Sequence, residues 1–232
     1  MTLLPSFQPG LNALIVGASG GLGSAFADLL DADAAVAHVA RWSRSSGVDL
    51  TDPASITVAA AALPAPPDLV VIATGVLHGE GLSPEKANNQ LSADALATSF
   101  AVNTIGPALV AKAVLPLMPR GRKSVLAALS ARVGSTADNR LGGWHSYRAS
   151  KAALNQLIRT MAIEQARRNP AQILLALHPG TVDTGLSKPF QTGVKTLFTP
   201  EESARHLLAV IDAATPAQTG LLIDWQGAVI PF

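Results

Sequence analysis

The sequence predicts one α/β domain, spanning 1–232, in which helices cover both faces of a doubly wound parallel sheet. Short, continuously apolar runs alternate with longer helical patterns along the chain, and no internal repeat interrupts them. A glycine cluster directly follows the first apolar run. A chain of 232 residues can bury one sizeable core, so we expect a single domain.

Composition excludes several functional classes. The formal net charge is +1 and charged residues make up 14% of the chain, which leaves no basic surface for nucleic acid. Cysteine is absent, and the five histidines show no metal-ligand spacing, so we expect no disulfide and no metal. There is no apolar run of about 18 residues and no signal-peptide pattern. We therefore expect a soluble, cytoplasmic protein that does not bind membranes.

The first predicted strand, residues 12–16, leads into Gly17-Ala18-Ser19-Gly20-Gly21-Leu22-Gly23 and then into a helical pattern. Glycines between a strand and a helix let the backbone approach a pyrophosphate, which the helix N-terminus attracts. We predict that this loop binds a dinucleotide. The alternative is a hydrolase nucleophile at Ser19, but that elbow requires a later central strand, followed in order by an acid and a histidine.

The second predicted strand, residues 34–41, ends in Arg41-Trp42-Ser43-Arg44. An acid in this region would bind the 2′-hydroxyl of an adenosine ribose, and none is present. The guanidinium groups of Arg41 and Arg44 suit a 2′-phosphate instead, so NADP(H) is the preferred cofactor and NAD(H) is possible. Two solvated arginines at a sheet edge are the alternative interpretation.

The middle of the chain contains a buried strand and a long helix. A helix begins at Thr51-Asp52-Pro53, where a cap precedes a first-turn proline. The apolar run 68–73 is typical of a parallel strand, and Thr74-Gly75 follows at its carboxyl end, where ligands bind in such sheets. After a loop at 79–90, residues 92–118 form a helical pattern that Asn103 and Pro107 break locally.

The next strand, residues 124–130, ends in Ser130, and a polar segment leads from it to a helix that carries Tyr147 and Lys151. Side chains four residues apart on a helix share one face. A nearby cation favours a phenolate, so we expect Lys151 to lower the pKa of Tyr147 and to make it a proton donor and acceptor near neutral pH.

The last third repeats the alternation of strand and helix. A strand at 172–177 is followed by a turn and by the segment 186–199, which has no clear period and is predicted to be a mobile lid over a substrate. A capped helix starts at Thr199-Pro200, and 221–223 form a final strand.

In this order and spacing, the motifs from Leu14 to about Ile223 resemble the short-chain dehydrogenase/reductase family. The resemblance implies a Rossmann-like fold with Tyr147 and Lys151 as the catalytic pair and Asn103 as a supporting residue. The segments 130–135 and 147–155 are similar to the carbonyl-reductase branch that includes the sniffer and C-factor proteins. The implied cofactor contacts are Gly17, Ser19, Gly20, Gly21, Leu22, Gly23, Arg41, Arg44, Asp49, Leu50, Ala73, Thr74, Gly75, Tyr147, Lys151, Pro179, Gly180, Thr181, Val182 and Thr184.

The chain departs from the family pattern at three places. Val16 replaces the usual threonine before the first glycine, and Ile72-Ala73-Thr74-Gly75 replaces the typical Asn-Asn-Ala-Gly. The family's catalytic serine lies three residues before a glycine, which here gives Ala131. We predict that Ser130 takes this role, with Ser135 as the alternative, although either hydroxyl could simply cap a turn.

The resemblance implies an enzyme that transfers hydride between NADP(H) and a carbonyl or alcohol substrate. The alternative is an NADP(H)-binding sensor or signalling protein with little or no catalysis, which has no need of Tyr147 and Lys151. The predicted pocket segments, 77–81, 135–144 and 186–198, suggest a small or medium apolar carbonyl compound. The helices at 92–118 and 147–168 are predicted to pair copies into a homodimer or homotetramer.

Overall fold

Nine strands occur in residues 2–232, which are the residues that the computed structural model describes: β1 (Leu11–Val16), β2 (Val36–Trp42), β3 (Leu69–Ile72), β4 (Ser124–Leu129), β5 (Gln172–His178), β6 (Thr181–Val182), β7 (Leu197–Phe198), β8 (Leu222–Asp224) and β9 (Val229–Ile230). Seven of them form one sheet in the order β2-β1-β3-β4-β5-β8-β9. Only the edge pair β8 and β9 is antiparallel. Strands β6 and β7 form a small separate sheet.

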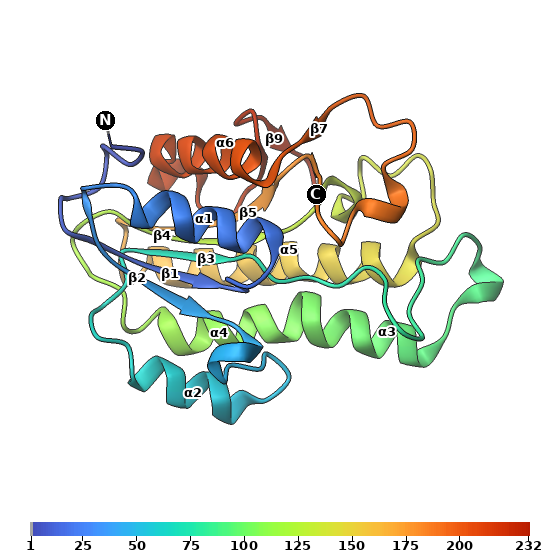
Figure 1. The fold of residues 1–232 in the computed structure, drawn as a ribbon, viewed down its shortest axis with the longest axis horizontal. Helices are drawn as coiled ribbons and strands as arrows, with labels where there is room; N and C mark the ends of the chain where they lie inside the picture. The colour runs from blue at the N-terminus through green and yellow to red at the C-terminus, as the bar shows by residue number, and fades with distance from the viewer. Residues whose placement is uncertain (1) are drawn as a thin grey trace.

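Helices cover both faces of the large sheet, as Figure 1 shows. The helices are α1 (Gly21–Asp31), α2 (Pro53–Ala61), α3 (Ala93–Phe100), α4 (Gly106–Val114), α5 (His145–Ala166) and α6 (Pro200–Ala213). Helices α1 and α6 pack on one face, and α2, α4 and α5 on the other. The predicted doubly wound fold is confirmed. None of the described helices is both long and apolar enough to cross a bilayer.

Each face of the sheet has its own apolar core, which explains why the central strands are continuously apolar in sequence. In β1, Ile15 packs toward Phe26 of α1, whereas its neighbour Leu14 packs toward the opposite core with Leu154 of α5. Successive side chains of a strand point to opposite faces, so a strand that is covered on both sides needs apolar residues at every position.

The chain order reverses at β1, which pairs with β2 on one side and with β3 on the other. Such a switch point opens a crevice beyond the carboxyl ends of the two strands whose connections leave in opposite directions. Gly17 follows β1 and Ala73 follows β3, and the Ala73 amide donates to the Val16 carbonyl at 2.8 Å. The fold therefore brings the glycine loop and residues 73–75 to one edge of the sheet.

The helical region predicted at 92–118 is divided as its sequence suggests. A π-helical turn, η3 (Ala101–Ile105), joins α3 to α4, and it contains Asn103. Pro107 lies in the first turn of α4, where its missing amide costs little. The break is thus a π turn within a continuous path, a feature that often marks functional sites.

Short helical turns occupy several of the connections between these elements, including the end of the loop predicted at 79–90. They are η1 (Arg44–Ser46), η2 (Asn88–Gln90), η4 (Arg132–Gly134), η5 (Lys188–Phe190) and η6 (Pro216–Gln218). The segment 186–199 holds η5 and β7, and Val182 pairs with Phe198 across it. This segment is therefore anchored at its carboxyl end.

Candidate active site

One cavity of about 560 Å³ lies at the carboxyl ends of β1, β3, β4 and β5, against the first turns of α5. It collects the polar groups that the sequence places after those strands. The predicted site residues that line it are Gly20, Gly21, Leu22, Ala73, Thr74, Gly75, Ser130, Tyr147, Lys151, Pro179, Gly180, Thr181, Val182 and Thr184. Motifs far apart in sequence thus meet in one place.

Two positions of the glycine loop, Gly17 and Gly23, are packed so closely that neither could carry a side chain. A Cβ atom on Gly17, whose φ is +87°, would lie 2.8 Å from the Thr74 methyl group. A Cβ atom on Gly23 would lie 2.1 Å from the Gly17 carbonyl oxygen. Helix α1 begins at Gly21, and its N-cap Gly20 offers no side-chain cap. The first backbone amides of α1 therefore have no side-chain acceptor, as a pyrophosphate-binding helix requires.

Tyr147 and Lys151 project from the same face of α5 into this cavity. The Lys151 Nζ lies 5.8 Å from the centroid of the Tyr147 ring and donates to the Leu129 carbonyl at 2.8 Å. Both residues are buried, with relative exposures of 8% for Tyr147 and 2% for Lys151. An ammonium has three donors, so two protons of Lys151 remain for a ligand or for the phenol.

Burial governs the protonation of this pair. It raises the pKa of Tyr147 to about 12 and lowers the pKa of Lys151 to about 8. Our expectation that Lys151 lowers the pKa of Tyr147 was therefore wrong for the protein without ligand. Removal from water disfavours the charged form of each group. At the separation seen here, this cost exceeds the attraction between a Tyr147 phenolate and the Lys151 ammonium.

Asn103 braces the site from outside the cavity. Its Oδ1 accepts from the Val76 amide at 2.8 Å, and its Nδ2 donates to the Val76 carbonyl at 2.9 Å and to the Ser150 Oγ at 3.1 Å. It does not line the cavity. These bonds tie the connection after β3 to the turn of α5 that carries Lys151.

The two candidate serines have different surroundings. Ser130 lines the cavity and donates from Oγ to the Asn155 Oδ1 at 2.6 Å. Ser135 lies outside the cavity lining; its hydroxyl donates to the Pro231 carbonyl and accepts from the Asp138 amide at 3.0 Å. Ala131, at the position given by the family spacing, presents only a methyl group to the cavity.

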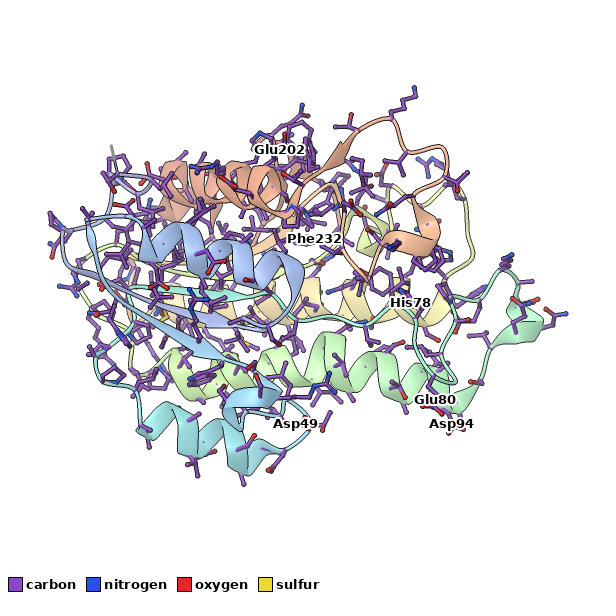
Figure 2. The ribbon with its side chains drawn as sticks, in the orientation of Figure 1. Asp49, His78, Glu80, Asp94, Glu202 and Phe232 are labelled. Carbon is purple, nitrogen blue, oxygen red and sulfur yellow. The ribbon has the colours of Figure 1, made fainter. Side chains whose placement is uncertain are left out.

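Seven predicted cofactor residues do not line the cavity. Gly17, Ser19 and Gly23 belong to the glycine loop, and Arg41, Arg44, Asp49 and Leu50 lie around the end of β2. Arg41 is engaged by Asp28, at 2.9 Å, and by Asp31 of α1. Arg44 makes no ion pair within residues 2–232. Asp49 accepts from the Thr51 amide at 2.8 Å, and Leu50 packs against Gly106. In Figure 2, Asp49 lies near the start of α2, well separated from His78.

The far wall of the cavity is apolar and largely aromatic. The rings of Trp144 and Phe190 lie 5.1 Å apart, and His78 packs edge-on against Phe190 at 5.7 Å. The His78 Nε2 also bonds to the Gly185 carbonyl at 3.0 Å, which fixes the segment before η5. Figure 2 shows His78 beside η5. Of the predicted pocket segments 77–81, 135–144 and 186–198, the residues that line the cavity are Leu77, Trp144, Leu186, Ser187 and Phe190, and the rest do not.

Six residues that line the cavity were not predicted from the sequence, and two of them, Arg132 and His178, carry ionisable side chains; the others are Leu129, Ala131, Val133 and Gly185. Burial lowers the pKa of His178 to about 4, with a further decrease from Arg132 and an opposing effect from Asp224. Arg132 is bound at 3.1 Å by both Asp138 and Asp224. Arg132 lies within the recognised segment 130–135, but its position there carries no sign of its contact with the cavity, and the strand register brings His178 beside Asp224. No group of three or more metal-ligating side chains occurs in the described chain.

The fold and this cavity define a dinucleotide-binding oxidoreductase, and comparison with known proteins gives its family. The family model for short chain dehydrogenases matches residues 45–195. The chain therefore belongs to the short-chain dehydrogenase family, as the motifs predicted.

Curated relatives match the chain over most of their own length. The C-signal protein of Myxococcus xanthus is 36% identical over 137 residues, which cover 59% of this chain and 78% of that protein. The 1-hydroxy-2-glutathionyl-2-methyl-3-butene dehydrogenase of Rhodococcus sp. (strain AD45) is 33% identical over 186 residues, or 80% of this chain and 79% of that one.

Solved structures support the fold. The NADPH-bound carbonyl reductase from chicken fatty liver superimposes with a TM-score of 0.84 at 24% identity, over 97% of this chain and 100% of that one. The carbonyl reductase Sniffer of D. melanogaster gives a TM-score of 0.76 at 18% identity, over 97% and 100%. At this level of identity the likeness concerns the fold alone.

Proposed function

We propose that this protein is an NADP(H)-dependent carbonyl reductase that acts on small or medium apolar aldehydes and ketones. The observation that carries the proposal is the meeting of Tyr147, Lys151 and Ser130 with the glycine loop in one cavity. An enzyme of this kind needs a cofactor cradle and a proton donor within reach of the same substrate atom.

The chain's own residues fit a nicotinamide dinucleotide. Gly17 and Gly23 leave no room for a side chain in this loop, and α1 presents uncapped amides beside it. The Thr74 Oγ1 is buried at the cavity without a hydrogen-bond partner among the described residues, so it is available to a ligand. When bound, the cofactor supplies the hydride.

Tyr147 is the proton donor in this proposal. With its pKa raised to about 12 by burial, the phenol is neutral at physiological pH and can give its proton to the oxygen of a carbonyl that is being reduced. The oxidation of an alcohol would require the phenolate first, which burial disfavours. The protonated phenol of the free protein is therefore the form that a reduction uses.

Ser130 and Lys151 assist from either side. Rotation of the Asn155 amide by half a turn would let its Nδ2 donate to the Ser130 oxygen and free the hydroxyl proton for the substrate oxygen. Lys151 is held by the Leu129 carbonyl and directs its remaining protons toward the cavity, where it can bind the cofactor ribose and support the charge of the phenol.

The cavity wall suggests the substrate class. Trp144, Phe190, Leu77 and Leu186 make this wall apolar, and the nearby Arg132 is neutralised by two aspartates. We propose that the segment 186–199 acts as the lid over this wall, with Phe190 as its contact to the substrate.

The test is to measure NADPH oxidation by the purified protein with a panel of apolar aldehydes and ketones. We expect at least one class of aldehyde or ketone to be reduced, and to be reduced faster with NADPH than with NADH. If NADPH binds but no carbonyl is reduced, the proposed activity is wrong.

That outcome would favour a second candidate function, a signalling protein that binds NADP(H), which the similarity to the C-signal protein supports.

A further inference from the structure

Glu85 is a buried carboxylate for which the proposed chemistry has no role. It lies in the connection between β3 and α3, with a relative exposure of 3%. Acidic side chains are almost never fully buried unless they are paired. Burial raises the pKa of Glu85, but hydrogen bonds from Ser146 and from the Glu85 backbone amide, together with the nearby His145, outweigh this effect, so its pKa lies below the ordinary value and the carboxylate is charged.

All of its polar contacts are to the start of α5. The Glu85 Oε2 accepts from the Ser146 amide at 3.1 Å, and its Oε1 accepts from the Ser146 hydroxyl. The Glu85 carbonyl accepts from the Trp144 amide. Glu85 and Ser146 are 61 positions apart in sequence, so these bonds hold two distant segments together.

Helix α5 has no cap of its own. Its N-cap residue is Trp144, which makes no side-chain cap bond, and there is no acidic residue in its first turn. The first amides of a helix need acceptors, and a negative charge at this end is favourable. Glu85 supplies both the hydrogen-bond acceptor and the negative charge, although it lies in a different part of the chain.

The backbone before α5 is strained in a way that Glu85 stabilises. Trp144 has φ +52° and is the only non-glycine residue with positive φ in residues 2–232. It follows Gly142 and Gly143, which are also left-handed, and a Cβ atom on Gly143 would lie 3.3 Å from the Glu85 carbonyl oxygen. A bulky residue holds such a conformation only where its surroundings enforce it.

This conformation matters because Trp144 and Tyr147 both face the cavity. Their ring centroids lie 6.2 Å apart, and both residues line the cavity. Glu85 itself does not line it. We propose that Glu85 is a positioning residue, which fixes the start of α5 so that the Tyr147 phenol and the Trp144 indole face the substrate. This inference rests on the proposed function in its assignment of Tyr147 as the proton donor.

Glu202 provides a matched control. Its Oε2 accepts from the Thr199 amide at 2.8 Å and from the Thr199 hydroxyl at 2.9 Å, so it caps α6 with the same chemistry. Neither residue lines the cavity, and Glu202 lies on α6 in Figure 2. Loss of the Glu202 cap should lower stability without moving Tyr147.

The first test compares Glu85→Ala and Glu85→Gln with Glu202→Ala in NADPH-dependent carbonyl reduction. A displacement of about 1 Å at a reacting group can cost about 100-fold in rate. We expect Glu85→Ala to lower kcat by about that factor with NADPH affinity unchanged. Glu85→Gln should recover most of the loss, because its oxygen still accepts from the Ser146 amide, and Glu202→Ala should keep its kcat. Equal kcat in Glu85→Ala and Glu202→Ala would overturn the inference.

The second test needs no substrate, so it separates this inference from the proposed function. Tyr147 is the only tyrosine in the sequence, and ultraviolet absorbance of phenolate therefore reports it alone. Its pKa is raised by burial to about 12. Wild type and Glu202→Ala should remain largely un-ionised at pH 10.5, whereas the phenol of Glu85→Ala should ionise at a lower pH than in wild type, because a displaced ring is less completely buried.

Circular dichroism at the same pH confirms that each variant is folded, and Lys151 is unchanged in all of them. If Glu85→Ala does not fold, Glu85→Gln is read instead, with a smaller shift in the same direction expected. A folded Glu85 variant whose phenol titrates as in wild type would show that Glu85 does not position Tyr147. If wild type reduces no carbonyl, the proposed function fails, and this titration still decides the role of Glu85.

Discussion

Lys151 is the residue whose charge is most sensitive to its surroundings at physiological pH. Burial lowers its pKa to about 8, from an ordinary value of 10.5. The ammonium is therefore charged below pH 8 in the free protein and loses its proton as the pH rises through that value. A neutral amine can neither attract the developing negative charge nor offer three donors.

This pKa leads to a prediction about rate. We expect kcat/KM for NADPH, measured at saturating carbonyl, to be flat below pH 8 and to fall by about tenfold per pH unit above it, because this ratio reports the essential groups of the enzyme form that NADPH encounters. Initial rates from pH 6 to 9.5 check this. A profile that stays flat through pH 9.5 would contradict the role given to the Lys151 charge.

The two serines allow a second test at the residue scale. Ser130→Ala should lower kcat by about 100-fold, because a donor to the substrate oxygen is lost. Ser135→Ala should leave kcat within about threefold and lower the free energy of unfolding by about 1 kcal/mol, through loss of its bonds to Pro231 and Asp138. Steady-state rates and urea midpoints measure the two effects. The opposite order of the kcat losses would assign the catalytic role to Ser135.

The sequence could not decide between these serines, because the family spacing falls on Ala131, which has no hydroxyl and lies between them. The strand ends at Leu129, which leaves Ser130 at the cavity, and the turn η4 then carries Ser135 away. The position of His178 could not be predicted either. It lies at the cavity, paired with Asp224 of β8, and this register is not visible in the sequence.

At the scale of elements, the end of β2 shows how a neighbouring helix changes the meaning of a motif. Arg41 and Arg44 are equivalent candidates in the sequence, but Asp28 and Asp31 of α1 engage Arg41. The ion pairs of Arg41 with Asp28 and Asp31 were not evident from the sequence, because the two aspartates lie 13 and 10 residues before Arg41 and belong to another element.

Cofactor preference tests this difference. We expect Arg44→Ala to weaken NADPH binding by about tenfold and to leave NADH binding unchanged, because a charge-assisted contact to the 2′-phosphate is worth about 1.5–3 kcal/mol before screening. Arg41→Ala is the control, with a smaller effect on NADPH. Nicotinamide fluorescence titration measures both. Equal weakening of NADPH and NADH by Arg44→Ala would rule out recognition of the phosphate.

For the molecule as a whole, the alternation of strands and helices was enough to predict the fold. The central strands β1, β3, β4 and β5 were predicted because each contains an unbroken run of at least four apolar residues, and their carboxyl ends bring the predicted motifs together. The strands β6, β7 and β9 were not predicted, because two residues carry no period. The contact of Glu85 with α5 was also beyond the sequence, since 61 residues separate the partners and no motif connects them.

The central claim is that Tyr147 gives the proton in a reduction that uses NADPH, and Tyr147→Phe tests it most directly. The substitution removes one hydroxyl from a ring that packs against Trp144, so the fold and cofactor cradle should persist. We expect kcat for carbonyl reduction to fall by at least about 100-fold, within the range that general acid catalysis supplies, with the Kd for NADPH unchanged. Turnover equal to that of wild type would contradict the claim.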